Sequence, residues 1–562
     1  MTRMQLQWRL AHLAATVTIA SLTTTASAIT FQVGEIEGQF DSNLSIGASW
    51  ALRNPDPELL HDPASDDGRR NFEKGETFSK VFKGVHDLEL KYGETGVFLR
   101  GKYWYDFELK DENRLFREMD DHNRKEGARS SGVQLLDAFI YHNYLLGDLP
   151  GSARVGKQVV SWGESTFIQG GINVINPVDA SAFRRPGAEV KEGLIPINML
   201  YLSQNLTEEI SVESFYQLEW DQTVIDNCGT FFSPNDTLAD GCSELEGPMG
   251  IIVPRGGDRD ARDGGQWGAA LRWFAPALDS ELAAYFINYH SRMPYFSTTG
   301  AVFMGDLNST SYFVEYPEDI QLYGLSISTM LPTGTTLAGE ISYRPNMPIQ
   351  ISPVDMVLAS TGIPTLSPVL SGGAVQFDSG MDLNGYRRKE MTQAQVTATH
   401  FFDQVMGAER LTLVGEVGVV HIGGIGGRRD LRYGRATAFG QGALYPENGV
   451  CTGFTNNLTP GNCTDDGFVT STSWGYRVRA IWEYNNVLPG VELRPNFAWS
   501  HDVSGYGNEP GFNEGSKAVS LGIDASVLNT YSANLSYTDF FGGDYNTNID
   551  RDFVALSFGV SF

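Results

Sequence analysis

Strand-like alternation recurs along almost the whole chain, and it is the feature that most limits the possible folds. Apolar and polar residues alternate with a period of two in eighteen segments, joined by alternately short and long connections. The short connections carry Gly, Pro, Asn and Asp, as hairpin turns require. The pattern predicts an all-β, transmembrane, antiparallel up-and-down β-barrel of about eighteen strands, with sixteen as the alternative. The segments are 37–52, 79–93, 95–110, 133–146, 150–162, 196–205, 207–218, 263–276, 280–290, 319–331, 334–345, 386–403, 406–421, 471–484, 488–502, 515–528, 531–542 and 550–562.

The last segment ends the chain at Phe562. Val554, Leu556, Phe558 and Val560 share its apolar face, whereas the alternate residues are Ala, Ser and Gly. A strand that ends on an aromatic residue resembles the closing strand of bacterial outer-membrane barrels, whose apolar face meets lipid. The alternative is an ordinary amphipathic strand of a soluble β-protein.

The N-terminus has the pattern of a secretory signal peptide. Arg3 and Arg9 precede an apolar stretch that ends near Leu22, and Ala26-Ser-Ala28 follows. We expect Sec-type export, cleavage after Ala28, and a mature chain 29–562 that forms one barrel domain. No later apolar run is long enough to span a bilayer as a helix. With both termini in the periplasm, the short connections are periplasmic turns and the long ones extracellular loops.

Charge and cysteine usage agree with an exported surface protein. The formal net charge of −27 argues against nucleic acid as a partner. The four cysteines form two local couples in long connections, and an oxidising compartment favours disulfides. We expect Cys228–Cys242 and Cys451–Cys463 among the three possible pairings. A zinc site is disfavoured because no histidine lies near either couple.

Charged residues occupy the polar faces of several segments, which would line the lumen. Their signs are interleaved, which is consistent with two interpretations: a selectivity ladder for charged solutes, or wall salt bridges that neutralise one another. The absence of an unbalanced basic stripe favours salt bridges. The predicted wall residues are Arg100, Lys102, Arg410, Glu416, Arg477, Arg479, Glu483, Glu492 and Arg494.

The connection 163–195, after the fifth segment, is a candidate constriction loop. Asp179 can cap a short helical turn that Pro186 and Gly187 end. A long insertion at this position resembles the constriction loop of general porins. The alternative is a loop on the outer surface. If the loop enters the barrel, the residues at the constriction are Asp179, Arg184, Arg185, Glu189, Lys191 and Glu192.

The connection 346–383 is unusually apolar for a loop. Ser352-Pro-Val-Asp355 predicts a helix start, with Ser352 as the cap and Asp355 as its capping-box partner. So much apolar surface should not face water, so the loops either pack on one another as a lid or form a vestibule for hydrophobic molecules. The two interpretations are compatible.

In the acidic stretch 544–552, solvated Asp and Asn are favoured over a calcium loop, which would need a central Gly and a distal Glu.

Several motifs resemble those of a family of large proteobacterial outer-membrane proteins of unknown function. They are Val155-Gly-Lys-Gln158, Trp162-Gly-Glu164, Asn176-Pro-Val-Asp179, Arg184-Arg-Pro186 and the segment Phe31–Trp50. The resemblance spans residues 29–562 and implies an outer-membrane location. It also implies an exported periplasmic or lipoprotein partner, because family members are often encoded beside such a protein and large inner-membrane exporters. It implies no catalytic residue.

Three function classes follow. We favour an outer-membrane channel for small hydrophobic or amphipathic molecules, with the lipid bilayer and the solute as partners and no cofactor. The alternative is a partner or receptor in an assembly that exports lipid or another product. An outer-membrane lipase is the least favoured of the three classes. The motifs Gly-x-Ser-x-Gly and His-Glu-x-x-His are absent, and no histidine has an obvious serine partner.

Overall fold

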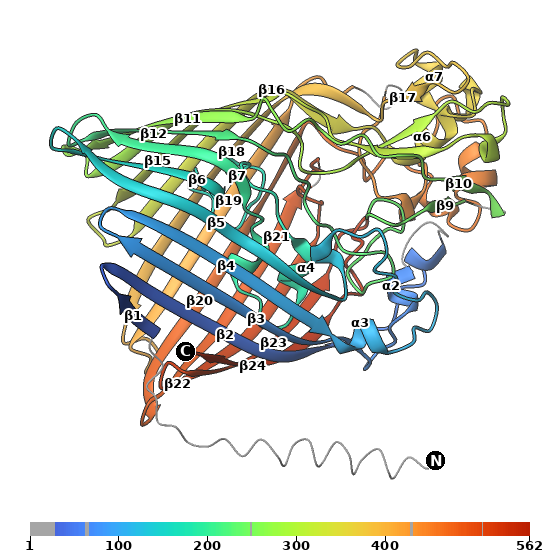
Figure 1. The fold of residues 1–562 in the computed structure, drawn as a ribbon. Helices are drawn as coiled ribbons and strands as arrows, with labels where there is room; N and C mark the ends of the chain where they lie inside the picture. The colour runs from blue at the N-terminus through green and yellow to red at the C-terminus, as the bar shows by residue number, and fades with distance from the viewer. Residues whose placement is uncertain (1–28, 62–66, 248–249, 427–430, 509) are drawn as a thin grey trace, which may run out of the picture.

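The computed structural model describes residues 29–61, 67–247, 250–426, 431–508 and 510–562, which form a closed antiparallel β-barrel (Figure 1). The predicted signal peptide 1–28 lies outside the described residues. Eighteen strands make the barrel wall, each pairing with its sequence neighbours in the wall, and β1 adds a nineteenth strand to the sheet. The first and last wall strands close the barrel, with Leu44 opposite Val560.

The predicted segments correspond one to one to the wall strands. The barrel prediction and the count of eighteen are therefore confirmed. The wall strands are β2 (Ile36–Ala51), β3 (Thr77–Tyr92), β4 (Thr95–Asp106), β5 (Ser131–Leu146), β6 (Leu149–Gln158), β7 (Ile197–Asn205), β8 (Ile210–Gln217), β11 (Trp267–Ala275), β12 (Ser280–Tyr289), β15 (Ile320–Met330), β16 (Thr336–Gln350), β18 (Tyr386–Asp403), β19 (Arg410–Ile422), β20 (Thr472–Leu488), β21 (Val491–Ser504), β22 (Lys517–Val527), β23 (Tyr531–Phe541) and β24 (Phe553–Ser561).

Several strand ends differ from expectation by four or five residues, and two of the differences have a clear local cause. The third segment, expected to reach residue 110, ends at Asp106, whose carboxylate accepts from the backbone N–H groups of Glu108 and Leu109. This cap starts helix α3 (Phe107–Asp111). The fifth segment ends at Gln158 instead of 162, because the chain there turns into the lumen. Trp162 is buried against Phe215 and donates from its indole N–H to Glu213.

The two barrel ends differ in their connections. All the tight turns lie at one end, the left of Figure 1, and the long connections gather at the other. The long connections hold the short helices and extra strands. These are α2 (Asp67–Arg70), α6 (Pro353–Ala359), α7 (Pro368–Ser371), η1 (Leu59–His61), η2 (Glu126–Ala128), η4 (Leu307–Ser309), η5 (Pro364–Leu366), η6 (Thr437–Phe439), the π-helix η7 (Cys451–Thr455), η8 (Pro460–Asn462), β9 (Glu244–Glu246), β10 (Ile252–Pro254), β13 (Tyr295–Thr299), β14 (Tyr312–Glu315) and β17 (Asp382–Leu383).

The apolar loops pack together over this end of the barrel. β13 pairs with β14 and β17 in a small sheet, and α6 lies against it. Burial of their side chains removes apolar surface from water. The lid interpretation therefore accounts for the buried side chains of these loops, whereas Phe303, Met304 and Met381 stay exposed. The buried cluster includes Phe296, Tyr312, Ile349, Ile351, Met356, Ala359, Val369 and Leu383.

The disulfides and the Ser352 helix cap of the lid were predicted correctly from the sequence, whereas the role of Asp355 was not. Both expected disulfides are present, Cys228–Cys242 and Cys451–Cys463. Ser352 caps α6 by accepting from the N–H of Asp355, with Pro353 in the first turn. The expected capping-box role of Asp355 is wrong, because its carboxylate instead forms a bidentate pair with Arg432.

The expectation of solvated carboxylates in 544–552 is also wrong for two residues. Asp550 is buried, 3.4 Å from the guanidinium of Arg69. Asp552 is 2.8 Å from Arg53. These ion pairs tie the start of the last strand to the first long connection.

Candidate functional site

The long connection between β6 and β7 lies inside the barrel and is held first by β19. Glu416, a buried inward-facing residue of β19, accepts three backbone N–H groups from the connection. The donors are Thr166, Phe167 and Ile168, at 2.9, 2.7 and 2.7 Å. Hydrogen bonds to a charged acceptor are stronger than neutral ones. One wall carboxylate thus fixes a whole turn of the loop.

A second anchor lies on β16. Glu340 accepts from the N–H groups of Glu164 and Ile172, at 2.5 and 2.9 Å. Arg344 donates to the carbonyl oxygens of Gly170 and Gly171, at 2.8 and 2.5 Å. A side chain at Gly171 would collide with the Glu340 carboxylate, so only glycine allows this approach.

The other half of the connection is held by the opposite side of the wall. Lys83 of β3 contacts Glu192 at 2.5 Å, and Lys102 of β4 contacts Asp179 at 2.9 Å. All four side chains are buried, and removing one partner of such a pair costs roughly 3–5 kcal/mol. In the strand order, β3 lies half the circumference away from β16. The connection therefore crosses the lumen and is fixed at both sides.

The sequence-predicted constriction residues fall into two groups. Asp179 and Glu192 are anchors, and Asp179 also caps α4 (Ala180–Arg184), which precedes α5 (Val190–Gly193). Arg185 is buried over Trp104, with its guanidinium carbon 4.3 Å from the ring centroid, and it donates to the carbonyl of Gly127. Burial lowers the pKa of Arg185.

The other three predicted constriction residues, Arg184, Glu189 and Lys191, are partly exposed. Glu189 accepts from Asn43 and lies 3.1 Å from Lys191. The Arg184 guanidinium lies 3.7 Å from Asp226 and stacks over the ring of Phe232. Burial raises the pKa of Asp226, and Arg184 opposes this rise. Five of the six predicted constriction residues therefore lie in ion pairs with other described residues, and Arg185 is the exception.

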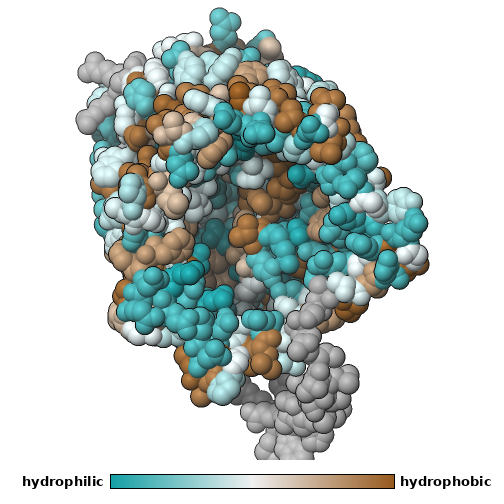
Figure 2. All heavy atoms as spheres, turned by 90° about the vertical axis from the view of Figure 1, so that its left-hand side faces the viewer, coloured by the Kyte–Doolittle hydropathy of each residue, from teal (hydrophilic) through white to brown (hydrophobic). Residues whose placement is uncertain are grey.

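Beside the connection lies a cavity of about 620 Å³ that reaches the tight-turn end of the barrel. Figure 2 shows this end, hollowed between the strands. One side of the cavity is the segment 183–189, and the other is the inner face of β21–β24 and β2. Small hydrogen-bonding side chains line that face, which leaves space next to the wall. They include Asn43, Ser45, Ser526, Ser532, Asn534, Ser536, Ser557 and Ser561.

Two kinds of contact hold the charged wall residues of this cavity. Arg494 lies 2.9 Å from Glu492, and Asp524 accepts from Asn534 and Asn496 at 2.5 and 2.9 Å. A solute in the cavity therefore meets many neutral hydrogen-bonding groups, the Arg494–Glu492 ion pair, and an Asp524 carboxylate that is held by two amides.

The remaining predicted wall residues differ in their partners. Arg100 binds Asp87 and Asp137, at 2.7 and 3.2 Å, and Arg477 binds Asp502 at 2.6 Å. Lys102 and Glu416 are loop anchors, as described above. Arg410 lies over the ring of Phe401. The side chains of Arg479 and Glu483 make no hydrogen bond or ion pair with any residue in the described ranges. Several of these charged wall residues therefore form ion pairs within the wall, as the salt-bridge interpretation predicts, and Arg479 is the clearest exception.

A cluster of phenylalanines borders the cavity. Phe232 lines the cavity, and its ring makes edge contacts with Phe78 and Phe553, with centroids 5.6 and 5.5 Å away. Phe231 stacks on Phe78 at 4.1 Å. Arg551, fully buried, donates to the carbonyl of Phe231. This cluster was not predicted from the sequence, although the adjacent Phe231 and Phe232 near Cys228 were a visible signal.

No helix in the described part of the chain has the length and apolar character needed to cross a membrane. The model of the family described as "Protein of unknown function (DUF1302)" matches residues 9–562. No curated protein sequence matches the chain.

Among solved structures, the fold is similar to OccAB1 of Acinetobacter baumannii, with 9% identity, coverage of 96% of this chain and 98% of the other, and a TM-score of 0.42. It is similar to Pseudomonas aeruginosa OpdK with vanillate, with 9% identity, 93% and 98% coverage, and a TM-score of 0.39. The outer-membrane channel DcaP of A. baumannii gives 9% identity, 95% and 99% coverage, and a TM-score of 0.36.

Proposed function

The chain belongs to the DUF1302 family of proteins of unknown function, and from its geometry we propose that it is an outer-membrane channel for small hydrophobic or amphipathic molecules. The lumen cavity is the observation that supports this most directly. It lies inside a closed wall, reaches the turn end, and is bounded by a loop that crosses the lumen. The many Ser and Asn side chains of its lining, with charges of both signs among them, favour no net charge on the solute.

The outer face of the wall supports a membrane location. Large apolar side chains on several strands point outward, and such a surface does not stay exposed on a soluble monomer. A bilayer satisfies it, because a closed barrel leaves no unpaired backbone edge in the hydrocarbon. Examples that are 47–59% exposed are Ile46, Leu325, Val396, Leu521, Leu535 and Phe558.

The channel proposal is tested by electrical recording. Purified full-length protein reconstituted in planar bilayers should give discrete conductance steps. Deletion of 163–195 should enlarge these steps, because it removes the segment that crosses the lumen. Absence of current in both the wild type and the deletion variant would rule out a pore.

The membrane-facing surface gives a prediction for β24. Phe558→Lys should sharply reduce the amount of folded barrel in outer membranes, because a lysine facing mid-membrane lipid costs roughly 2–4 kcal/mol. Ser536→Lys, on the inward face of β23, is the matched control and should assemble like the wild type. Folded barrel is measured by its heat-modifiable mobility in gel electrophoresis. Equal assembly of the two variants would contradict the assigned faces.

A partner role in an export assembly is the second candidate, and β1 (Ile29–Val33) favours it. This strand pairs with residues 36–40 of β2, and all five of its residues are exposed. An exposed apolar edge strand can add a strand from another protein. A photocrosslinker at Gln32 should capture an exported protein in cells, whereas one at Thr333, in another turn at the same end, should not. Equal crosslinking at both positions would count against this role.

A further inference from the structure

A second cavity, of about 520 Å³, lies among the long connections, away from the lumen cavity. Its lining is mostly apolar and comes from separate connections. The side chains that matter here are Leu245 and Val253 of the β9–β10 hairpin, Val354 and Val357 of α6, and Phe454 and Leu458. Leu458 is 65% exposed, which places it at the rim.

Helix α6 contacts both the lid cluster and the cavity. Met356 and Ala359 point into the buried lid cluster. Val354 and Val357 lie three positions apart, share another face, and line the cavity. Val357 also packs against the lid cluster, so the cavity borders that cluster, and Val354 and Val357 form its α6 wall.

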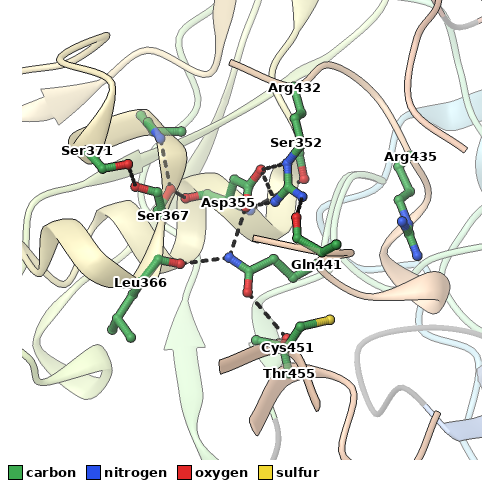
Figure 3. Close-up of polar contacts among 12 residues, drawn as sticks. Ser352, Asp355, Leu366, Ser367, Ser371, Arg432, Arg435, Gln441, Cys451 and Thr455 are labelled. Atoms are coloured by element: carbon green, nitrogen blue, oxygen red, sulfur yellow. Dashed lines mark hydrogen bonds and ion pairs between the residues drawn. The ribbon is translucent and has the colours of Figure 1, made fainter. Parts of the chain in front are cut away.

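A buried polar network holds the walls of this cavity in place (Figure 3). The Asp355 carboxylate binds Arg432 with contacts of 2.7, 2.8 and 3.0 Å and accepts from the Gln441 amide at 3.0 Å. Gln441 also donates to the carbonyl of Leu366 at 2.7 Å. The buried charge pair ties α6 to Arg432, and breaking such a pair costs several kcal/mol. The Gln441 hydrogen bonds tie α6 and Leu366 to segment 437–459, so the walls of the cavity are held apart by bonded elements.

Hydrogen bonds of Arg435 and a disulfide also hold the part of the cavity wall that segment 437–459 provides. Arg435 donates to the carbonyl oxygens of Phe439, Asn462, Thr464 and Asp466. Burial lowers the pKa of Arg435 to about 10. The disulfide Cys451–Cys463 closes the segment that carries Phe454 and Leu458. A preformed pocket of this kind binds ligands without a large ordering cost.

The polar groups of the lining indicate the ligand class. Thr437, Thr455 and Asn457 offer neutral hydrogen-bonding groups, and Glu246 and His61 are the titratable residues of the lining. No basic Arg or Lys side chain among the described residues lines the cavity, so an anion would gain no counter-charge. We propose that this cavity binds an uncharged molecule with an apolar body and a hydroxyl or carbonyl group, at a site distinct from the lumen.

The test uses full-length protein in lipid nanodiscs and a photoactivatable diazirine analogue of a medium-chain primary alcohol. Mass spectrometry should map saturable adducts to the peptides carrying 353–358 and 454–459. Excess unlabelled alcohol should displace them. Val357→Asp should reduce these adducts at least tenfold, because it places a charge against apolar walls. Labelling of the lipid-facing wall strands should stay unchanged and serves as the internal reference.

Two controls keep the result decisive. Met381→Asp, on an exposed side chain outside the lining, should label like the wild type. Val354→Trp should fill the cavity without adding charge and also reduce the adducts, which covers the case in which Val357→Asp misfolds. Unsaturable labelling, or equal labelling in all variants, would overturn the site. Equal labelling by the carboxylate analogue of the probe would overturn the ligand class.

This proposal and the channel can fail separately. Conductance without saturable labelling would remove the outer site and leave the channel. Saturable labelling without conductance would keep the site and remove the channel.

Discussion

Replacing Glu416 with alanine is expected to release the crossing loop from β19 and raise single-channel conductance severalfold. The substitution leaves the backbone N–H groups of Thr166, Phe167 and Ile168 without their acceptor. A buried donor without a partner costs about 1–3 kcal/mol, so three such donors favour a loop that leaves the wall and becomes hydrated. The lumen then widens on the β19 side.

Two measurements separate loop release from a general loss of structure. Planar-bilayer recording gives the conductance, and hydrogen exchange gives the protection of the amides at 166–168, which should fall in Glu416→Ala. Glu416→Gln keeps one acceptor oxygen and should be intermediate. Glu492 lines the lumen cavity and pairs with Arg494 of its own strand, so Glu492→Gln is the matched control and should leave both quantities near wild type. Lost protection with unchanged conductance would mean that this part of the loop does not limit the pore.

The barrel wall could be predicted from sequence because its determinants are local. A period of two and the Gly, Pro, Asn and Asp of the turns set each strand and its two faces, without knowledge of distant contacts. The disulfides were predictable for the same reason, since each pair is separated by 14 or 12 residues. Ser352 and Asp179 cap the helices that begin immediately after them.

The loop anchors and the outer network depend on contacts that sequence spacing does not reveal. Glu416 binds an amide 249 positions earlier in the chain, and Glu340 binds one 168 positions earlier. Alternation places both glutamates on the inward face but cannot identify their partners. Asp355 was assigned to a local cap, yet a bidentate pair with Arg432, 77 positions away, is the stronger interaction.

Replacing Phe232 with alanine is expected to open the lumen cavity toward the long connections. The ring fills the space between Phe78, Phe553 and the Arg184 guanidinium, whose carbon lies 4.3 Å from the ring centroid. Removal of a buried Phe side chain typically leaves a cavity and costs about 3–5 kcal/mol. Here the vacated volume would join the lumen cavity, because Phe232 lines it. Conductance should rise, and Arg184 should lose the surface on which it stacks.

The opening is measured directly by the accessibility of a cysteine in the lumen. Ser532→Cys lies on the inward face of β23 in the cavity. A bulky, membrane-impermeant maleimide added outside intact cells should label it slowly in the otherwise wild-type protein and at least tenfold faster with Phe232→Ala. Phe439→Ala removes an equally buried ring from a different cluster and is the matched control. Fast labelling in all three proteins would show that solute reaches the cavity by a route that Phe232 does not close, so the barrier would lie elsewhere along the crossing loop.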